Sequence, residues 1–187
     1  MTEVVALARK AGWEYLIVDG VNIPTERIDA RFTAKQHWYS GKHKRHGGAV
    51  QTVAAPDGEL LWVCGVLPGK TVDIRAARRF GIAEKVLRFL GLLADLGYIG
   101  LHPDVVTGYK RKRGEKALPE GKKAANAALA GLRAIGERAN AQLKQWRVLA
   151  CDFRGHPRQL TTVVKAVQTV QYLIRDPFGT AGTGTGS

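Results

Sequence analysis

The chain has 187 residues, of which 45% are hydrophobic, so it can bury a core and fold as one domain rather than remain disordered. Lys and Arg number 29 against 16 Asp and Glu, and the net charge of +13 favours a polyanionic partner over a small neutral substrate. No apolar run is long enough to span a membrane and the first residues form no secretory signal, so we expect a cytosolic protein without a membrane partner. The two cysteines, Cys64 and Cys151, fit neither a disulfide framework nor a zinc-binding pattern.

The first elements along the chain are predicted to be strands. Residues 14–18 are a short apolar run, predicted to be a buried strand that ends in a turn at Asp19. The runs at 49–54 and 59–67 are predicted to pair as a hairpin, because the Ala-Pro-Asp-Gly sequence at 55–58 favours a tight turn.

A second aspartate follows a similar strand further along. Thr71 is predicted to cap a helix that ends after Phe80, and another helix is predicted over 83–89. The apolar run 92–94 then predicts a strand that ends at Asp95. The pattern of a short apolar strand followed by an aspartate therefore occurs twice.

The second half of the chain is predicted to be mainly helical. A basic loop over 108–116 precedes a helix over 122–146, in which small and apolar residues recur every three or four positions. A last helix is predicted over 160–174, and the Gly- and Thr-rich residues 179–187 are predicted to be disordered.

Three acidic residues form the candidate catalytic site. Asp19 and Asp95 each follow an apolar strand, and Glu137 lies in the long helix beside its buried stripe. Such carboxylates can converge on one point, where they suit a hard cation such as Mg²⁺, and a pair of such ions can carry phosphodiester chemistry. The alternative is that both aspartates are ordinary turn residues and that Glu137 pairs with Arg133 on the helix surface.

Other acids and histidines are weaker candidates. Asp57 is predicted to be a turn residue, and Asp73 is either an acid favoured in the first turn of a helix or a support for the catalytic site. His37, His43 and His46 lie among basic residues without matching acids or cysteines, so we expect a phosphate-contacting surface there rather than a metal site.

Basic side chains from three segments are predicted to contact DNA phosphates. They come from the histidine-rich segment, from the basic loop and from the long helix. They are Lys42, Lys44, Arg45, Lys110, Arg111, Lys112, Arg113 and Lys144.

Five segments carry recognisable motifs in the same order. They are 16–20 (LIVDG), 39–46 (YSGKHKRH), 68–73 (PGKTVD), 94–100 (ADLGYIG) and 126–147, which contains Gly136-Glu137-Arg138. Together they resemble the DDE superfamily transposases, in particular the endonucleases of insertion sequence family five and their Harbinger-like relatives. The resemblance covers most of the chain.

This resemblance implies an α/β fold with a ribonuclease-H-like mixed sheet flanked by helices, over residues 14–176. Residues 1–13 are then a short N-terminal remnant in place of the helix-turn-helix domain that family members carry, and 177–187 are a disordered tail. The implied partners are double-stranded DNA, a separate chain that carries the helix-turn-helix domain, and a second copy in a homodimer.

The resemblance also implies the activity. Asp19, Asp95 and Glu137 would bind two Mg²⁺ or Mn²⁺ ions, cleave DNA at the transposon ends and transfer the freed strand to target DNA. Two positions depart from the family pattern, Leu96 where the family has lysine and Val72 where it has histidine.

These departures support a second hypothesis, in which the chain is a truncated and catalytically inactive relic that only binds nucleic acid through its basic surface. A third hypothesis, a ribosomal or other RNA-binding protein, would require the ordered motifs to match by chance. Nicking of supercoiled DNA with a divalent cation separates the first two hypotheses.

Overall fold

A mixed sheet forms the centre of the molecule, and the computed structural model describes residues 1–26 and 38–178. The strands are β1 (Tyr15–Pro24), β2 (Tyr39–Ser40), β3 (Arg45–Ala54), β4 (Leu60–Val63), β5 (Leu67–Pro68), β6 (Gly91–Leu93) and β7 (Val105–Val106). β1 is central, with β3 antiparallel on one side and β6 parallel on the other. β7 continues the sheet beyond β6, and β2, β5 and β4 pair in turn with the other edge of β3.

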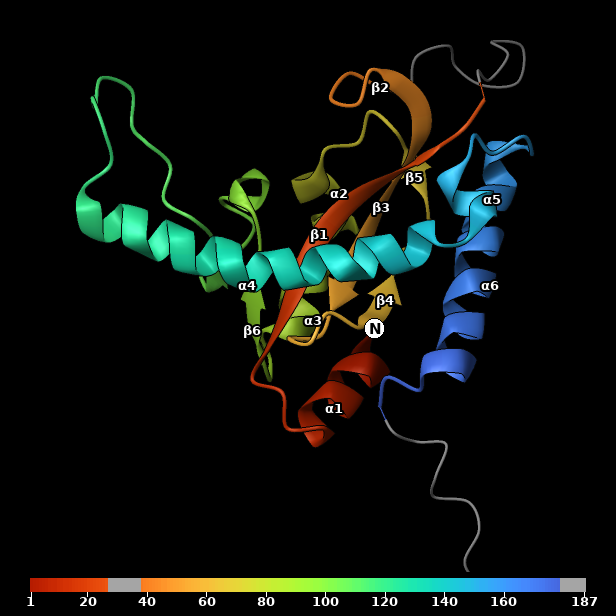
Figure 1. The fold of residues 1–187 in the computed structure, drawn as a ribbon, viewed down its shortest axis with the longest axis horizontal. Coiled ribbons are helices and arrows are strands. Elements are labelled where there is room, and N and C mark those ends of the chain that lie inside the picture. Colours follow the sequence, from red (N-terminus) through yellow and green to blue (C-terminus); the bar gives the residue numbers. More distant parts are fainter. Residues whose placement is uncertain (27–37, 179–187) are drawn as a thin grey trace, which may run out of the picture.

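Helices cover both faces of this sheet (Figure 1). They are α1 (Thr2–Lys10), α2 (Asp73–Phe80), α3 (Ile82–Val86), the short 3-10 helix η1 (Leu96–Tyr98), α4 (Glu120–Lys144), α5 (Arg147–Ala150) and α6 (Pro157–Arg175). The first three α-helices pack on one face, and α4 crosses the other face together with α5 and α6.

Alternation along β1 explains the two layers, because successive side chains of a strand point to opposite faces. Leu16 and Val18 belong to the core beneath α1, α2 and α3. Ile17, Val21 and Ile23 belong to the core beneath α4, α5 and α6. Asp19 lies two residues from both Ile17 and Val21 along the strand, so its side chain points to the same face as theirs, toward α4.

Several predicted elements are confirmed. β3 and β4 form the predicted antiparallel hairpin, and α2 ends at Gly81, which adopts the left-handed conformation. A strand precedes Asp95 as expected, and the two long predicted helices correspond to α4 and α6. The basic loop over 108–116 lies between β7 and α4 without regular secondary structure.

Other predictions about local structure were wrong. β1 continues through Asp19 to Pro24, so Asp19 lies in mid-strand rather than in a turn, because pairing with β3 extends the strand past Gly20. The run predicted as one strand over 59–67 is divided into β4 and β5. Thr71 does not cap α2, which begins after Val72 without a side-chain cap.

The N-terminal residues 1–13, predicted to be a short remnant, contain α1, whose Val4, Val5 and Ala8 are buried in the same core as β1 and β6. In the described ranges, no helix is long and apolar enough to cross a membrane. His37 and the tail from residue 179 onward lie outside the described residues.

Candidate active site

The sheet register brings Asp19 and Asp95 to the same level. β1 and β6 are parallel neighbours, and Ile17 pairs with Leu93 at the last bridge between them. Asp19 and Asp95 each lie two residues beyond that pair. Because neighbouring strands are only about 4.8 Å apart, the two carboxylates lie next to each other above the end of β6.

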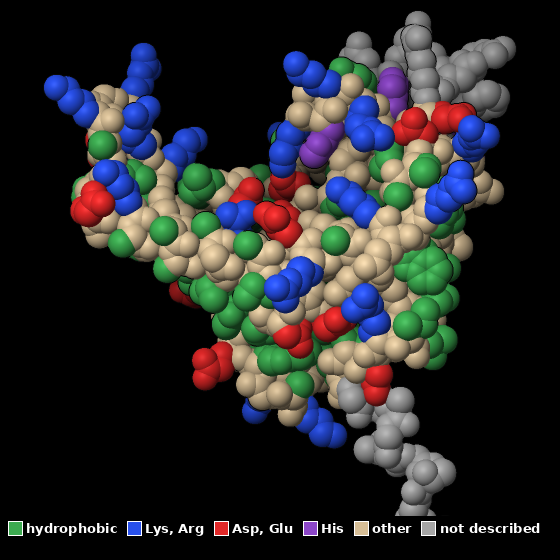
Figure 2. All heavy atoms as spheres, viewed as in Figure 1, with side chains coloured by type: hydrophobic (Ala, Val, Ile, Leu, Met, Phe, Trp, Pro, Cys, Tyr) green, Lys and Arg blue, Asp and Glu red, His purple; other side chains and the backbone are tan. Residues whose placement is uncertain are grey.

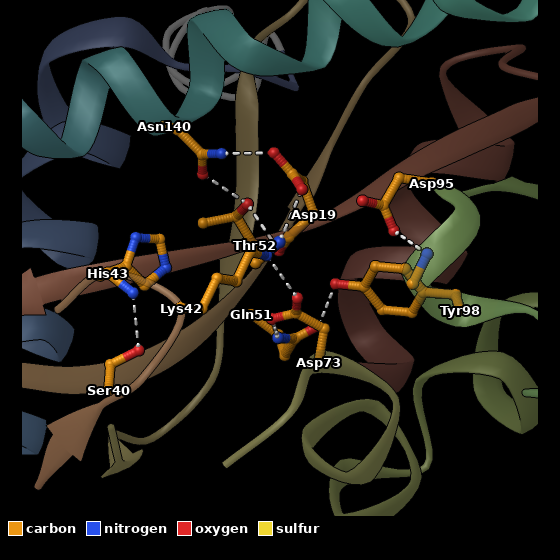
Figure 3. A network of polar contacts seen from close by, with 12 residues as sticks. Asp19, Ser40, Lys42, His43, Gln51, Thr52, Asp73, Asp95, Tyr98 and Asn140 are labelled. Carbon is orange, nitrogen blue, oxygen red and sulfur yellow. Dashed lines mark hydrogen bonds and ion pairs between the residues drawn. The ribbon is translucent and has the colours of Figure 1, made fainter. Parts of the chain in front are cut away.

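Hydrogen bonds fix the Asp19 carboxylate between β1, β3 and α4 (Figure 3). Asn140 Nδ2 on α4 donates to Asp19 Oδ2 at 2.7 Å, and the Gly20 backbone N–H donates to Oδ1 at 2.8 Å. Thr52 Oγ1 donates toward Asn140 Oδ1 at 2.8 Å, which orients the amide with its N–H₂ toward Asp19. Asp95 in turn accepts a hydrogen bond from the Gly97 backbone N–H at 2.7 Å.

The environment of Asp19 disfavours its charged form. Burial is the main cause that raises the pKa of Asp19 above its usual value, and the neighbouring carboxylates of Asp95 and Asp73 add to it. The Gly20 hydrogen bond and the positive charge of Arg133 act in the opposite direction. A cation between the aspartates would relieve this repulsion.

Glu137 lies on α4 between the two residues that act on Asp19. Arg133 is one helical turn before it and Asn140 is one turn after it, so all three share one face of the helix. The Glu137 side chain is exposed. Within the described residues, no group of three or more His, Cys, Asp or Glu side chains is close enough to hold a metal ion. The structure thus brings Asp19 and Asp95 together, whereas Glu137 is exposed on α4, one helical turn from Asn140, and does not close a three-acid cluster with them.

Asp73 extends the polar network on the other side of β1 (Figure 3). Its carboxylate accepts hydrogen bonds from Lys42 Nζ at 3.1 Å and from Gln51 Nε2 at 3.3 Å. Gln51 Oε1 accepts a 2.5 Å hydrogen bond from the Tyr98 hydroxyl, and both of these side chains are buried. A Cβ at position 20 would overlap the Asp73 carboxylate, so only glycine allows this close approach.

This network holds a cation close to the acids. Partial burial by itself lowers the pKa of Lys42, but the hydrogen bond and ion pair with Asp73, and attraction to Asp95 and Asp19, raise it above its usual value. Lys42 therefore stays protonated at neutral pH. Of the two roles considered for Asp73, the contacts support the one in which its side chain belongs to the site.

The predicted phosphate contacts are exposed and lie around a hollow. Lys42 and Lys44 lie in the turn between β2 and β3, where Arg45 also forms an ion pair with Asp152. The second group, Lys110 to Arg113, lies on what we call the arm, residues 107–132, which comprises the basic loop and the first half of α4. Figure 1 shows the arm extending away from the body of the molecule.

The hollow lies between these two basic projections. Figure 2 shows Lys and Arg side chains at both projections and acidic side chains gathered on the floor between them. Lys144, the last predicted contact, is exposed at the end of α4, and its charge acts on His43. Asn126 fixes the base of the arm, because its amide exchanges two hydrogen bonds with the backbone of Tyr109.

Sequence reasoning missed Gln51, Thr52 and Tyr98. Gln51 and Thr52 are consecutive polar residues inside an apolar run of β3, and both are buried. Two polar residues in such a run are a signal for a buried hydrogen-bond network, because burying unpaired polar groups is costly. Tyr98 lies in the motif at 94–100, which could have singled it out, although nothing local shows that its hydroxyl reaches Gln51.

The chain belongs to the DDE superfamily endonuclease family, whose model matches residues 18–171 and so covers most of the chain. It is 32% identical over 142 residues to a protein assigned as a transposase for insertion sequence element IS112 of Streptomyces albus G. That alignment covers 75% of this chain and 52% of the relative, so the chain spans about half the length of the relative. No solved structure matches the chain.

Proposed function

We propose that this chain is the catalytic domain of a transposase that cleaves DNA with Asp19, Asp95 and Glu137 and then transfers the strand. The observation that carries this proposal is that Asp19 of β1 and Asp95, just after the parallel neighbour β6, each lie two residues beyond the last bridge between these strands, and that Asn140 of α4 is hydrogen-bonded to Asp19. Membership of the DDE endonuclease family supports the same assignment.

The fold that we propose for it is ribonuclease-H-like. Three features support this: a central β1 between an antiparallel and a parallel neighbour, helices on both faces, and two acids below a crossing helix, Asp19 within β1 and Asp95 just after the adjacent β6. Asp95 is held in place by its hydrogen bond from the Gly97 N–H at the start of η1, which favours precise geometry.

The residues present fit a hard divalent cation, Mg²⁺ or Mn²⁺. Asp19 and Asp95 offer carboxylate oxygens, the donors that such ions prefer, and the pKa of Asp19 is raised by burial and by the neighbouring acids. Asp19, Asp95 and Glu137 would hold the ions, and we propose two of them. When bound, such ions polarise the phosphodiester and lower the pKa of water, which makes it a nucleophile.

Other residues of the chain have supporting roles. Asn140 holds the Asp19 carboxylate in one orientation, and Thr52 holds Asn140. Lys42, kept in place by Asp73, provides a positive charge where negative charge increases on the phosphate in the transition state. It can thereby replace the lysine that the family carries at the position of Leu96.

The DNA duplex would lie in the hollow between the arm and the turn between β2 and β3. Cations on both projections can then contact phosphates while the scissile bond faces the acids on the floor. These contacts carry no sequence information, so we propose that a helix-turn-helix domain outside this catalytic fold, for example on a partner chain, recognises the transposon ends, and that two copies of the chain act together.

Nicking of supercoiled plasmid DNA with Mn²⁺ tests the proposal. We expect the wild type to nick and Asp19→Asn, Asp95→Asn and Glu137→Gln each to lose activity by at least about a hundredfold, because the lost carboxylate no longer neutralises the cation. Asp57→Asn is the matched control, since Asp57 lies in the turn between β3 and β4 and its side chain accepts a hydrogen bond from the Glu59 backbone N–H that asparagine can also accept.

Two results would contradict this function. Wild-type protein that binds DNA but does not nick it with any divalent cation would support the inactive relic. Nicking that survives Glu137→Gln but not Asp95→Asn would remove Glu137 from the site.

A further inference from the structure

A pocket opens beside the acidic site, on the face of β1 opposite Asn140. It has a volume of about 300 Å³, at the lower end of the range for small-ligand sites. Three separate segments and Ala49 of β3 line it: 20–22 of β1, 40–43 at the turn between β2 and β3, and 69–73 before and at the start of α2. These segments overlap three of the five sequence motifs, 16–20, 39–46 and 68–73. The proposed catalytic acids account for the first of these motifs but not for the other two.

Small residues keep the pocket open. Gly20, Gly41, Ala49 and Gly69 contribute to its lining, so little side-chain volume fills it. At one end it adjoins the proposed active site, because Gly20 follows Asp19 and because Lys42 and Asp73 belong to both. A ligand in the pocket can therefore continue into the active site.

Asn22 supplies unused hydrogen-bonding groups to this pocket. Asn22 is part of the lining, and its amide nitrogen and oxygen are both buried without a hydrogen-bond partner among the described residues. Buried polar atoms without partners cost free energy, so a bound group that provides a donor and an acceptor would stabilise the amide after a change of rotamer. The edge of a nucleobase provides such an adjacent donor and acceptor.

The charges around the pocket suit phosphate. Lys42 and Lys70 are part of its lining, and the only acid there, Asp73, is already paired with Lys42. A second hollow shares Lys70 and Thr71 with the pocket and adds Arg75, so the positive surface continues away from the acids. A chain of phosphates could pass from the active site over the pocket to this second hollow.

We propose that the pocket binds one unpaired nucleotide of the DNA substrate, with its base against Asn22 and its phosphates at Lys42 and Lys70. The inference rests on the proposed function in that the nucleotide belongs to DNA cleaved at the acids. Removing one nucleotide from the stack costs only a few kcal/mol, which contacts in a fitted pocket can offset. The bound nucleotide would place the neighbouring phosphodiester at the acids.

Binding of deoxyadenosine monophosphate to the whole chain tests this inference. The titration is followed by ligand-observed NMR with EDTA present, and deoxyadenosine and inorganic phosphate are titrated in parallel. We expect the monophosphate to bind more tightly than either part. Asn22→Leu should weaken it about tenfold, since it keeps the volume but removes the donor and the acceptor.

A second variant tests the inference even if Asn22→Leu does not fold. Thr71→Trp places a large ring at the partly exposed rim and should block binding, whereas the matched change Thr162→Trp on the exposed surface of α6 should not. Thermal unfolding shows which variants are folded.

The outcomes separate the pocket from the catalytic function. The inference is overturned if phosphate alone binds as tightly as the nucleotide, if no nucleotide binds, or if folded Asn22→Leu and Thr71→Trp both bind like the wild type. The titration contains no divalent cation and no cleavable DNA, so nucleotide binding does not depend on catalysis. A wild type that binds the nucleotide but never nicks DNA would refute the catalytic function and still support the inference about the pocket.

Discussion

Lys42 is the residue whose role the structure clarifies most. The sequence suggests a phosphate contact on a basic surface, but the ion pair with Asp73 holds its Nζ close to the acids. A fixed cation beside a scissile phosphate stabilises charge that develops in the transition state more than charge in the ground state. We therefore expect Lys42 to affect the rate of cleavage and Lys44 to affect mainly DNA binding, although the two lysines are two residues apart and carry the same charge.

We predict that Lys42→Ala lowers the single-turnover nicking rate at saturating DNA by about 10²–10³, the usual effect of removing one such donor. Lys44→Asn is the control, because asparagine tolerates the left-handed backbone that Lys44 adopts at φ 49°. It should weaken DNA binding while leaving the rate at saturation nearly unchanged. Equal rates for the two variants would show that Lys42 only binds DNA.

Leu96 occupies the position at which related sequences carry lysine, directly after Asp95. Its side chain is 46% exposed and contacts Gly108, where the chain enters the arm. We predict that Leu96→Lys raises metal-dependent nicking, by up to about 10²-fold, because a second cation would then lie beside the acids. Single-turnover rates measured at equal stability test this.

The matched control is Leu173→Lys, which adds the same charge at an exposed position of α6. If it accelerates nicking as much as Leu96→Lys does, the gain comes from general attraction to DNA. If Leu96→Lys leaves the rate unchanged, position 96 only packs the base of the arm.

At the scale of elements, α4 makes an especially close contact with the sheet at Gly136. A Cβ at Gly136 would lie 2.7 Å from Ile17 Cγ2, so the helix backbone rests directly on β1 next to Glu137 and Asn140. We predict that Gly136→Ala destabilises the protein by about 1–3 kcal/mol, the range for overpacking a core, although alanine favours helix. Denaturant unfolding measures the change.

Gly131→Ala on the same helix provides the comparison. No atom lies within 4 Å of a Cβ at that position, so this variant should be more stable than the wild type by about 0.5–1 kcal/mol through helix propensity alone. Similar effects of the two alanines would mean that α4 does not press on β1 at Gly136.

An element can be predicted from the sequence when the residues that determine it are neighbours in the chain. The hairpin of β3 and β4 and the helices α4 and α6 were predicted because turn residues and helical periodicity are local properties. The extension of β1 past Asp19 depends on pairing with β3, about thirty residues away, and no local pattern shows it. The helix α1 was not predicted, because it is short and depends on burial against the core.

The candidate site was predictable to a similar extent. Motifs identified Asp19, Asp95 and Glu137, and Asp19 and Asp95 do lie level with each other, while the role of Glu137 stays a prediction. The links from Asp73 to Lys42 and from Gln51 to Tyr98 join residues from different segments. Such contacts depend on tertiary structure, so the sequence alone could not provide them.

At the scale of the whole molecule, the positive charge is spread over two projections. We predict that replacing Lys110, Arg111 and Lys112 by alanine reduces the slope of log affinity against log salt concentration by about 2 to 3, since each phosphate contact contributes about 0.9. Fluorescence anisotropy with a duplex of arbitrary sequence measures the slope.

The control removes the same number of charges elsewhere, by replacing Arg9, Lys10 and Arg88 with alanine. These residues lie on α1 and just after α3, on the face of the sheet opposite α4. The slope should change little. An equal fall in both triple variants would mean that net charge, rather than the arm, governs binding.

The close contact between Gly136 and Ile17 lies in the half of α4 that packs on the sheet, where Ala139 and Leu143 are buried and Gln142 is hydrogen-bonded to the hairpin of β3 and β4. Glu137 lies one residue from this contact, about 1.5 Å along the helix axis, whereas Glu120 at the far end of the arm lies about 24 Å away. A bend of the helix near the contact would therefore displace the end of the arm much further than it displaces Glu137. Such a bend would let the arm follow differences in the path of a bound duplex while the acid hardly moves.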